Sequence, residues 1–283
     1  MSEISNYKRG GFMFLILPPA PKLATLVHAY WFIEDLPGEY AGRLTRTSPI
    51  PLAVLSVNMG RPNAAEDGGL VPSVSFLGLQ SQSRAWRSWS ETNFVMVMLT
   101  IPGLVRLFPH TGLGVADMLL DLAALTGDAP AQTLKNGVGL EQEPRRIAAL
   151  LDHWLISRMG SMRPVSEGKQ IAIAHSILQG GGTVETAAET AQVSRRQLHR
   201  LFLRHLGMGP KSLSDLERLH SSLKSVQSES GEPVHGFSDQ AHQIRSWQRR
   251  LGVTPGAYAR EARTPLADHF GAHGGPSGIA YYL

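Results

Sequence analysis

Short apolar runs separated by Gly and Pro dominate the first hundred residues. The runs cover residues 12–17, 23–33, 52–58, 74–80, 83–89 and 94–101. Runs of this length between turn residues are typical of β-strands, and FVMVMLTI at 94–101, which stops at Pro102, is the strongest of them. Several short strands in succession predict a small β-sandwich or barrel.

The period of the pattern changes after residue 110. Val115, Met118, Leu119 and Leu122 recur at helical spacing, which predicts a helix that ends at Gly127. A second helix is expected from about residue 141 to 159, with one apolar stripe. The stripe consists of Ile147, Leu150, Leu151, Trp154 and Leu155. It has the width to pack on the strands or to pair two subunits, so we treat it as a candidate dimerisation surface while keeping simple packing open.

Two short helices with a tight turn between them are predicted from residue 183 onward. The first ends near Ala191, and the second begins after Ser194, which forms a capping box with Gln197 three residues later. Leu198, Leu201, Phe202 and His205 share one face of the second helix, and four basic residues lie off that face. A helix pair with an exposed basic second helix predicts a helix-turn-helix unit that fits the major groove.

A second stretch, GFSDQAHQIRSWQRRLGVTPGAY at 236–258, begins in a similar way, with Ser238 as the expected N-cap of an Arg-rich helix. Together with VSRRQLHRLFLRHLGMGPK at 193–211, it resembles the AraC/XylS family of transcription regulators. The resemblance implies a DNA-binding domain with two helix-turn-helix units. The opening that ends in Tyr30–Trp31, and TIPGLVRLF at 100–108, further resemble the cupin-like regulatory half of such proteins.

We therefore expect an α+β chain with three parts. Residues 1–160 form a regulatory and dimerisation domain, a small cupin-like β-barrel plus two helices; residues 161–263 form an all-α DNA-binding domain with two helix-turn-helix units; and residues 264–283 form a flexible tail. The expected partners are double-stranded DNA, a second copy of the chain and an unidentified small-molecule effector, with RNA polymerase as a further candidate.

The charge distribution agrees with a DNA-binding C-terminal half. The chain has a formal net charge of +4, and residues 167–263 hold thirteen Lys/Arg against nine Asp/Glu. A phosphate-binding surface needs such an excess, although an ordinary solvated basic face would also produce it.

The candidate DNA contacts fall into three groups. Arg196, His199 and Arg200 lie on the exposed face and match the groove-facing positions of the family, so they are the expected base readers. For the neighbouring Arg195, Arg204 and Lys211 we expect solvent exposure or phosphate contact. In the second unit Gln240 and Arg245 match groove-facing positions.

The second unit departs from the family in two places. Only Glu232–His235 remain for its supporting helix, and Pro233 interrupts them. Gln243 stands where the family has an apolar core residue. We therefore expect base discrimination mainly from the first unit.

No catalytic, metal or cofactor motif accompanies these units. The chain has no Cys, which fits a soluble cytoplasmic protein, and its apolar run at 12–17 is too short for a signal core. Only His28 and His110 occur among the strands, too few for a cupin metal site. Two alternatives to an independent regulator stay open: a partner-binding modulator with weak DNA affinity of its own, and a cupin-type enzyme.

Overall fold

The computed structural model describes residues 5–9, 11–227, 237 and 239–262. The predicted tail 264–283 and the shortened support at 232–235 lie outside these residues. Among the described residues, no helix is long and apolar enough to cross a membrane.

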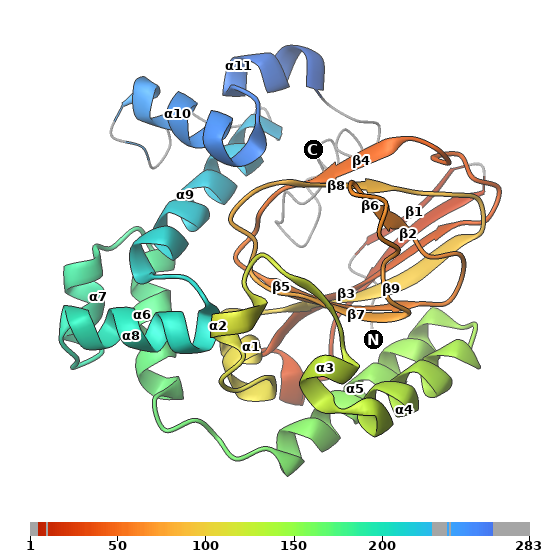
Figure 1. The fold of residues 1–283 in the computed structure, drawn as a ribbon, viewed down its shortest axis with the longest axis horizontal. Coiled ribbons are helices and arrows are strands. Elements are labelled where there is room, and N and C mark those ends of the chain that lie inside the picture. The colour runs from red at the N-terminus through yellow and green to blue at the C-terminus, as the bar shows by residue number, and fades with distance from the viewer. Residues whose placement is uncertain (1–4, 10, 228–236, 238, 263–283) are drawn as a thin grey trace.

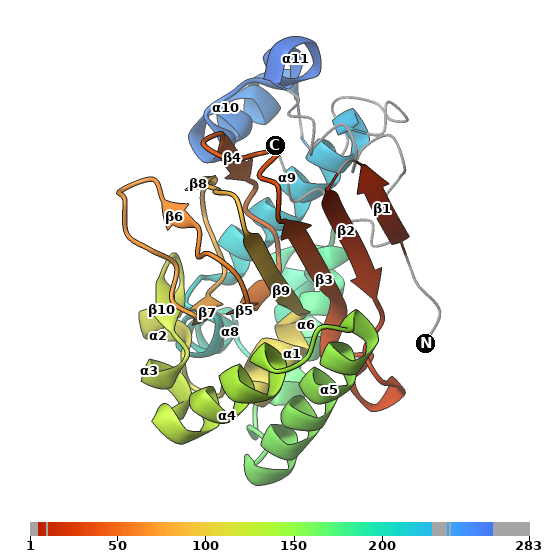
Figure 2. The same cartoon turned by 90° about the vertical axis from the view of Figure 1, so that its right-hand side faces the viewer.

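Two antiparallel sheets form the N-terminal half (Figure 1). The larger has seven strands, in spatial order β1 (Ser5–Arg9), β2 (Phe12–Leu17), β3 (Val27–Asp35), β9 (Thr92–Leu99), β5 (Ala53–Asn58), β7 (Val74–Leu77) and β10 (Leu119–Asp121). The smaller has three, in the order β4 (Leu44–Thr47), β8 (Arg84–Arg87) and β6 (Ala64–Ala65). Figure 2 shows β1, β2, β3 and β9 side by side.

Both faces of the seven-stranded sheet are buried, which explains the continuous apolar runs of its central strands. Val95 and Val97 of β9 face a core shared with the helices, whereas Met96 and Met98 face the smaller sheet. The mixed architecture, with antiparallel sheets followed by helices, is confirmed. The described strand pairs form two open sheets and no closed ring, so the cupin-like barrel stays a prediction.

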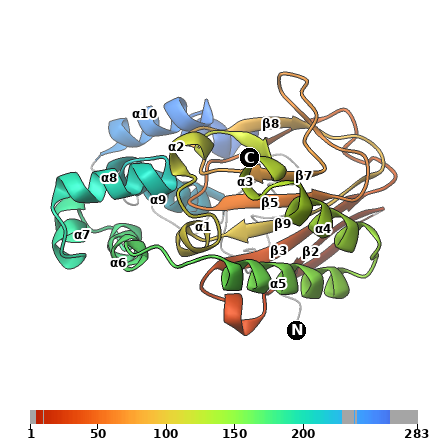
Figure 3. The ribbon, with the colours of Figure 1, turned by 60° about the horizontal axis from the view of Figure 1, so that its bottom comes forward.

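The helices follow in two groups. Those of the N-terminal half are η1 (a 3-10 helix, Pro21–Leu23), α1 (Ile101–Leu107), α2 (Gly112–Val115), α3 (Ala123–Thr126), α4 (Asp128–Gly139) and α5 (Pro144–Ser161). Those of the C-terminal half are α6 (Gly168–Gln179), α7 (Val184–Thr190), α8 (Arg195–Leu206), α9 (Pro210–Gln227), α10 (Gln240–Leu251), α11 (Pro255–Ala257) and the π-helical η2 (Tyr258–Ala262). Helices α4 and α5 lie against the larger sheet (Figure 3).

The prediction of one helix through Val115 and Leu122 was wrong. Helix α2 ends at Val115, and β10 pairs Leu119–Asp121 with Ser75–Leu77 of β7. Asp117 lies between them with φ 59°, a left-handed conformation that no α-helix continues through. Spacing favoured a helix, but pairing with the sheet edge satisfied the same backbone groups and decided the structure.

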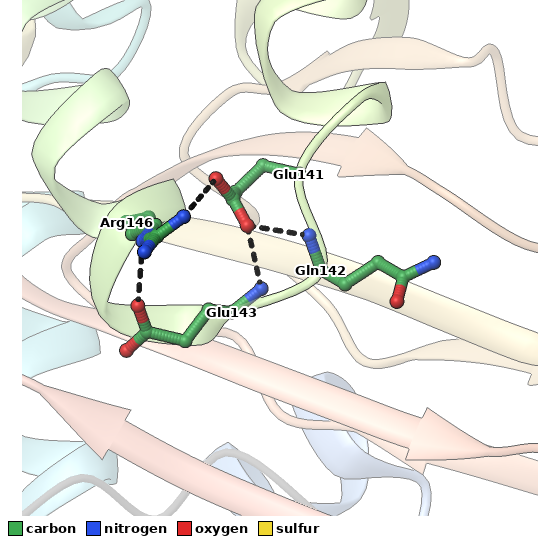
Figure 4. A network of polar contacts seen from close by, with 4 residues as sticks. All are labelled: Glu141, Gln142, Glu143 and Arg146. Carbon is green, nitrogen blue, oxygen red and sulfur yellow. Dashed lines mark hydrogen bonds and ion pairs between the residues drawn. The ribbon is translucent and has the colours of Figure 1, made fainter.

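Helix α5 begins at Pro144, close to the predicted start, and a polar network holds its N-terminus (Figure 4). The Glu141 carboxylate accepts hydrogen bonds from the backbone N–H groups of Gln142 (2.9 Å) and Glu143 (3.0 Å). Arg146 forms ion pairs with Glu143 (3.2 Å) and Glu141 (3.8 Å). The two backbone hydrogen bonds lower the pKa of Glu141, and Arg146 adds to the effect.

Candidate nucleic-acid interface and effector cavity

Helices α7 and α8 form the first predicted unit. The Thr183 hydroxyl caps α7 by accepting from the N–H of Thr186 at 3.1 Å. At the turn Gln192 has φ 56°, so the chain reverses there without a glycine. Ser194 and Gln197 form the predicted capping box, with reciprocal side-chain bonds of 3.1 and 2.8 Å. These caps satisfy free N–H groups at both helix starts and hold α8 at a defined angle.

The inner face of α8 is buried as expected. Leu198 and Phe202 have no exposed surface and pack with Ala187 and Ala188 of α7. His205 is also fully buried, and neither of its ring nitrogens has a hydrogen-bond partner among the residues that the structure describes. Its ring lies 5.0 Å from that of His110 in the N-terminal half. Burial, followed by the nearby His110 and Arg204, lowers the pKa of His205.

The six candidate basic residues of the first unit, five on α8 and one on α9, fall into two groups. Arg195 pairs with Glu185 (3.0 Å), Arg204 with Glu167 (3.8 Å) and Lys211 of α9 with Asp215 (3.1 Å). Arg196, His199 and Arg200 are exposed and make no ion pair or side-chain hydrogen bond among the described residues. The expected readers are therefore the ones whose donors remain available for a nucleic acid.

Of the second unit the structure describes α10, which packs on α9. The N-cap of α10 is Asp239, whose carboxylate accepts from the N–H of His242 at 2.7 Å, so the expected cap at Ser238 was one residue early. Asp carries the negative charge that complements a helix N-terminus. Gln240 and Arg245 are exposed, and Arg245 forms no ion pair among the residues described.

Gln243, the departure from the family pattern, is only 1% exposed. Its amide Nε2 donates to the hydroxyl of Ser222 on α9 at 2.9 Å, and the indole Nε1 of Trp247 donates to the same oxygen at 3.1 Å. A buried amide is tolerated where a partner satisfies it. Ser222 therefore compensates for Gln243 and joins α9 to the recognition helix α10 of the second unit.

Residues 187–261 match a family model described as a helix-turn-helix domain. This segment is an AraC-type helix-turn-helix domain. The match includes α8 and α10, which carry all the predicted DNA contacts except Lys211, and that residue lies on α9 within the same span. No curated protein matches the chain.

Solved structures give weaker similarities. ToxT from Vibrio cholerae O395 is 12% identical, with a TM-score of 0.42 over 81% of this chain and 96% of that one. ToxT from strain SCE256 with an unsaturated fatty acid bound is 11% identical, with a TM-score of 0.40 over 81% and 93%. CuxR, an AraC-like transcriptional activator, is 15% identical, with a TM-score of 0.26 over 70% and 72%. The assignment of residues 187–261 as an AraC-type domain therefore rests on the family-model match and not on these structures.

A cavity of about 90 Å³ lies between the two sheets of the N-terminal half. Phe14, Ile33 and Met96 of the larger sheet form part of an apolar floor, and Trp86 of the smaller sheet lies over it. Its polar groups include the hydroxyls of Thr45, Thr47, Ser56 and Ser75. No local motif in the sequence marks this cavity, because its lining comes from strands far apart along the chain.

The predicted dimerisation stripe has two environments. Ile147, Leu151, Trp154 and Leu155 are buried in the core that α5 shares with the larger sheet, and the Trp154 Nε1 donates to the carbonyl of Pro130 at 3.1 Å. Leu150 alone of the five is exposed, at 39%. Four of these side chains thus serve the chain's own packing. Pairing of subunits through α5 stays a prediction that now depends on the exposed face around Leu150.

Metal ligands do not gather in the part of the chain that the structure describes: no group of three or more His, Cys, Asp or Glu side chains could hold an ion there. His175 and Glu217 form a buried pair at 2.9 Å. This pair joins α6, which precedes the AraC-type domain, to α9 within that domain.

Proposed function

We propose that this chain is a sequence-specific DNA-binding transcription regulator and has no catalytic role. The observation that carries the proposal is the capped α8 helix, which presents Arg196, His199 and Arg200 to solvent within the AraC-type domain. Guanidinium groups pair with guanine O6 and N7 in the major groove, and an imidazole donates to an acceptor on a base edge.

In this proposal the first unit reads bases and the second mainly contacts the DNA backbone. Arg196, His199 and Arg200 support the first assignment, because they are exposed and have no ion-pair partner among the described residues. Arg245 supports the second as an exposed cation. The two-sheet half is a cupin-like sensor in the same proposal, and the exposed face of α5 around Leu150 pairs two copies.

The effector we propose is a compact, largely apolar molecule with one or two hydrogen-bonding groups. The cavity between the sheets supports this class because its floor is aromatic and aliphatic, whereas its polar groups are mainly hydroxyls. A volume of about 90 Å³ is well below the roughly 300–1,000 Å³ of most ligand pockets. A larger effector must therefore widen the cavity or extend through its open side.

The test uses the full chain. Binding sites are first selected from random double-stranded DNA, and the affinity for the preferred site is then measured over a series of salt concentrations. We expect a preferred sequence and an affinity that falls steeply with salt. Arg196→Ala should lower the affinity at least tenfold, whereas Lys135→Ala, an equal charge change at an exposed position of α4, should change it little. Equal effects of the two variants, or no selected sequence, would contradict the proposal.

A further inference from the structure

Three hydrogen bonds connect the N-terminal half to the C-terminal end of α10. The guanidinium Nη2 of Arg46 donates to the carbonyl of Leu251 at 2.6 Å, and the backbone N–H of Ser83 donates to the carbonyl of Arg250 at 2.7 Å. In return, Nη1 of Arg250 donates to the carbonyl of Ser81 at 2.8 Å. Residues about 170 to 205 positions apart along the chain thus meet at one helix end.

These contacts satisfy groups that α10 cannot satisfy itself. The last carbonyls of an α-helix have no partner within the helix, and they form the negative end of its dipole. A guanidinium at this end both donates a hydrogen bond and places a positive charge where it is favourable. Arg46 also donates to the Ser83 hydroxyl at 3.2 Å, so the two residues act together as a cap supplied by another domain.

Strand β4 places this cap next to the cavity. Successive side chains of a strand point to opposite faces, so Thr45 and Thr47 line the cavity while Arg46 points outward to α10. On β8, which pairs with β4, Trp86 lines the cavity and its indole N–H donates to the Thr47 hydroxyl at 2.9 Å. The paired strands β4 and β8 therefore form one wall of the cavity and also hold the residues that cap α10.

The two walls differ in how firmly they are held. The larger sheet is backed by α4 and α5 in a continuous core, and Tyr30 of β3 donates to the buried Asp152 of α5 at 2.7 Å. Within the part of the chain that the structure describes, the opposite wall consists of three short strands. An occupant that needs more than about 90 Å³ between the sheets extends through the open side of the cavity or displaces a wall, and among the described residues the three-stranded sheet is the wall with less packing behind it.

We propose that Arg46 and Ser83 form a C-terminal cap of the second reader helix, and that filling of the inter-sheet cavity weakens this cap by moving β4 and β8. The inference rests on the proposed function, because it assigns a regulatory consequence to the effector cavity. Arg46 acts on DNA binding through α10 and is a positioning residue.

The first experiment tests the cap by hydrogen exchange of the full chain. Arg46→Ala should speed exchange of the peptide covering residues 240–252 about tenfold and leave the α8 peptide unchanged, because the cap supports only α10. Arg46→Lys should restore part of the protection, since an ammonium group also donates to carbonyls. Arg87→Ala is the matched control, because Arg87 is an exposed arginine on β8 whose guanidinium donates to the carbonyl of Gly42.

The second experiment fills the cavity without a ligand. Ser75 of β7 is 2% exposed and lines the cavity, so Ser75→Leu adds volume there, and Ser75→Ala adds none. Ser75→Leu should speed exchange of the same α10 peptide. In the double variant with Arg46→Ala the effects should not add, because both act through one cap. If Ser75→Leu does not fold, Ser56→Leu from the neighbouring strand replaces it.

Each result separates this inference from the proposed function. Unchanged α10 exchange in Arg46→Ala, or fully additive effects in the double variant, would overturn the cap or its coupling to the cavity, whether or not the chain binds DNA. A confirmed cap in a chain that selects no DNA sequence would leave the contact standing and refute the regulator. The chain has no Cys, so exchange can be measured without disulfide side reactions.

Discussion

Ser222 offers the sharpest test of whether the second unit is intact despite its departure from the family pattern. Its hydroxyl has no exposed surface and accepts hydrogen bonds from both Gln243 and Trp247 of α10. Ser222→Ala removes this acceptor and leaves the indole N–H of Trp247, which has no exposed surface, without the partner it has among the described residues.

The magnitude follows from these two bonds. A buried donor left without a partner costs about 1–3 kcal/mol, and loss of a satisfied hydrogen bond costs about 0.5–1.5 kcal/mol. We therefore expect Ser222→Ala to lower the free energy of unfolding by about 1.5–4.5 kcal/mol. Replacing the amide as well, in Ser222→Ala with Gln243→Leu, should recover part of this loss, because one of the two polar groups is then gone.

Urea denaturation of the full chain measures the effect, and the adjacent Ser221→Ala is the matched control. Ser221 is exposed on α9, so its replacement should change the unfolding free energy by less than about 0.5 kcal/mol. A Ser222→Ala protein within that same margin of the wild type would refute the reasoning that Ser222 compensates for Gln243.

The remaining predictions concern specificity, the domain interface and pH. Arg200→Ala should cost about 1–3 kcal/mol on the preferred site and flatten the preference at one base pair, whereas Arg245→Ala should weaken binding to all single-base variants by a similar factor; the reverse pattern would exchange the roles of the two helices. Gly112→Ala should destabilise the chain by about 1–3 kcal/mol, because an added Cβ would lie 2.5 Å from the backbone of α8. Gly114→Ala, which has open space around it, should leave the stability unchanged, and thermal unfolding measures both variants. The free energy of unfolding should fall as the pH drops below about 6.5, because the pKa of buried His205 is lowered in the folded chain and the unfolded chain therefore binds the proton first. His205→Leu should make the unfolding free energy, measured by urea titrations at several pH values, depend less steeply on pH. An unchanged dependence would contradict the role given to His205.

Local signals in the sequence were sufficient for the first unit. Ser194 and Gln197 specify the start of α8 by side-chain bonds within one helical turn, and Leu198 and Phe202 reveal the buried face by their spacing. The continuous apolar run at 94–101 likewise predicted a strand, because a strand buried on both faces needs apolar residues at every position. In both cases the deciding interactions are close in the sequence or repeat with one period.

Tertiary contacts decided the rest. The edge of β7 turned the helical pattern at 115–122 into β10, and the hydroxyl of Ser222 made a buried Gln243 acceptable. In the apolar stripe of α5, Leu151 is buried against the larger sheet and Leu150 is exposed. The sequence could not distinguish the two, because both are leucines in the same stripe. The cavity between the sheets and the contact of Arg46 with Leu251 join residues that are distant along the chain, and only the folded arrangement brings such groups within hydrogen-bond or van der Waals range.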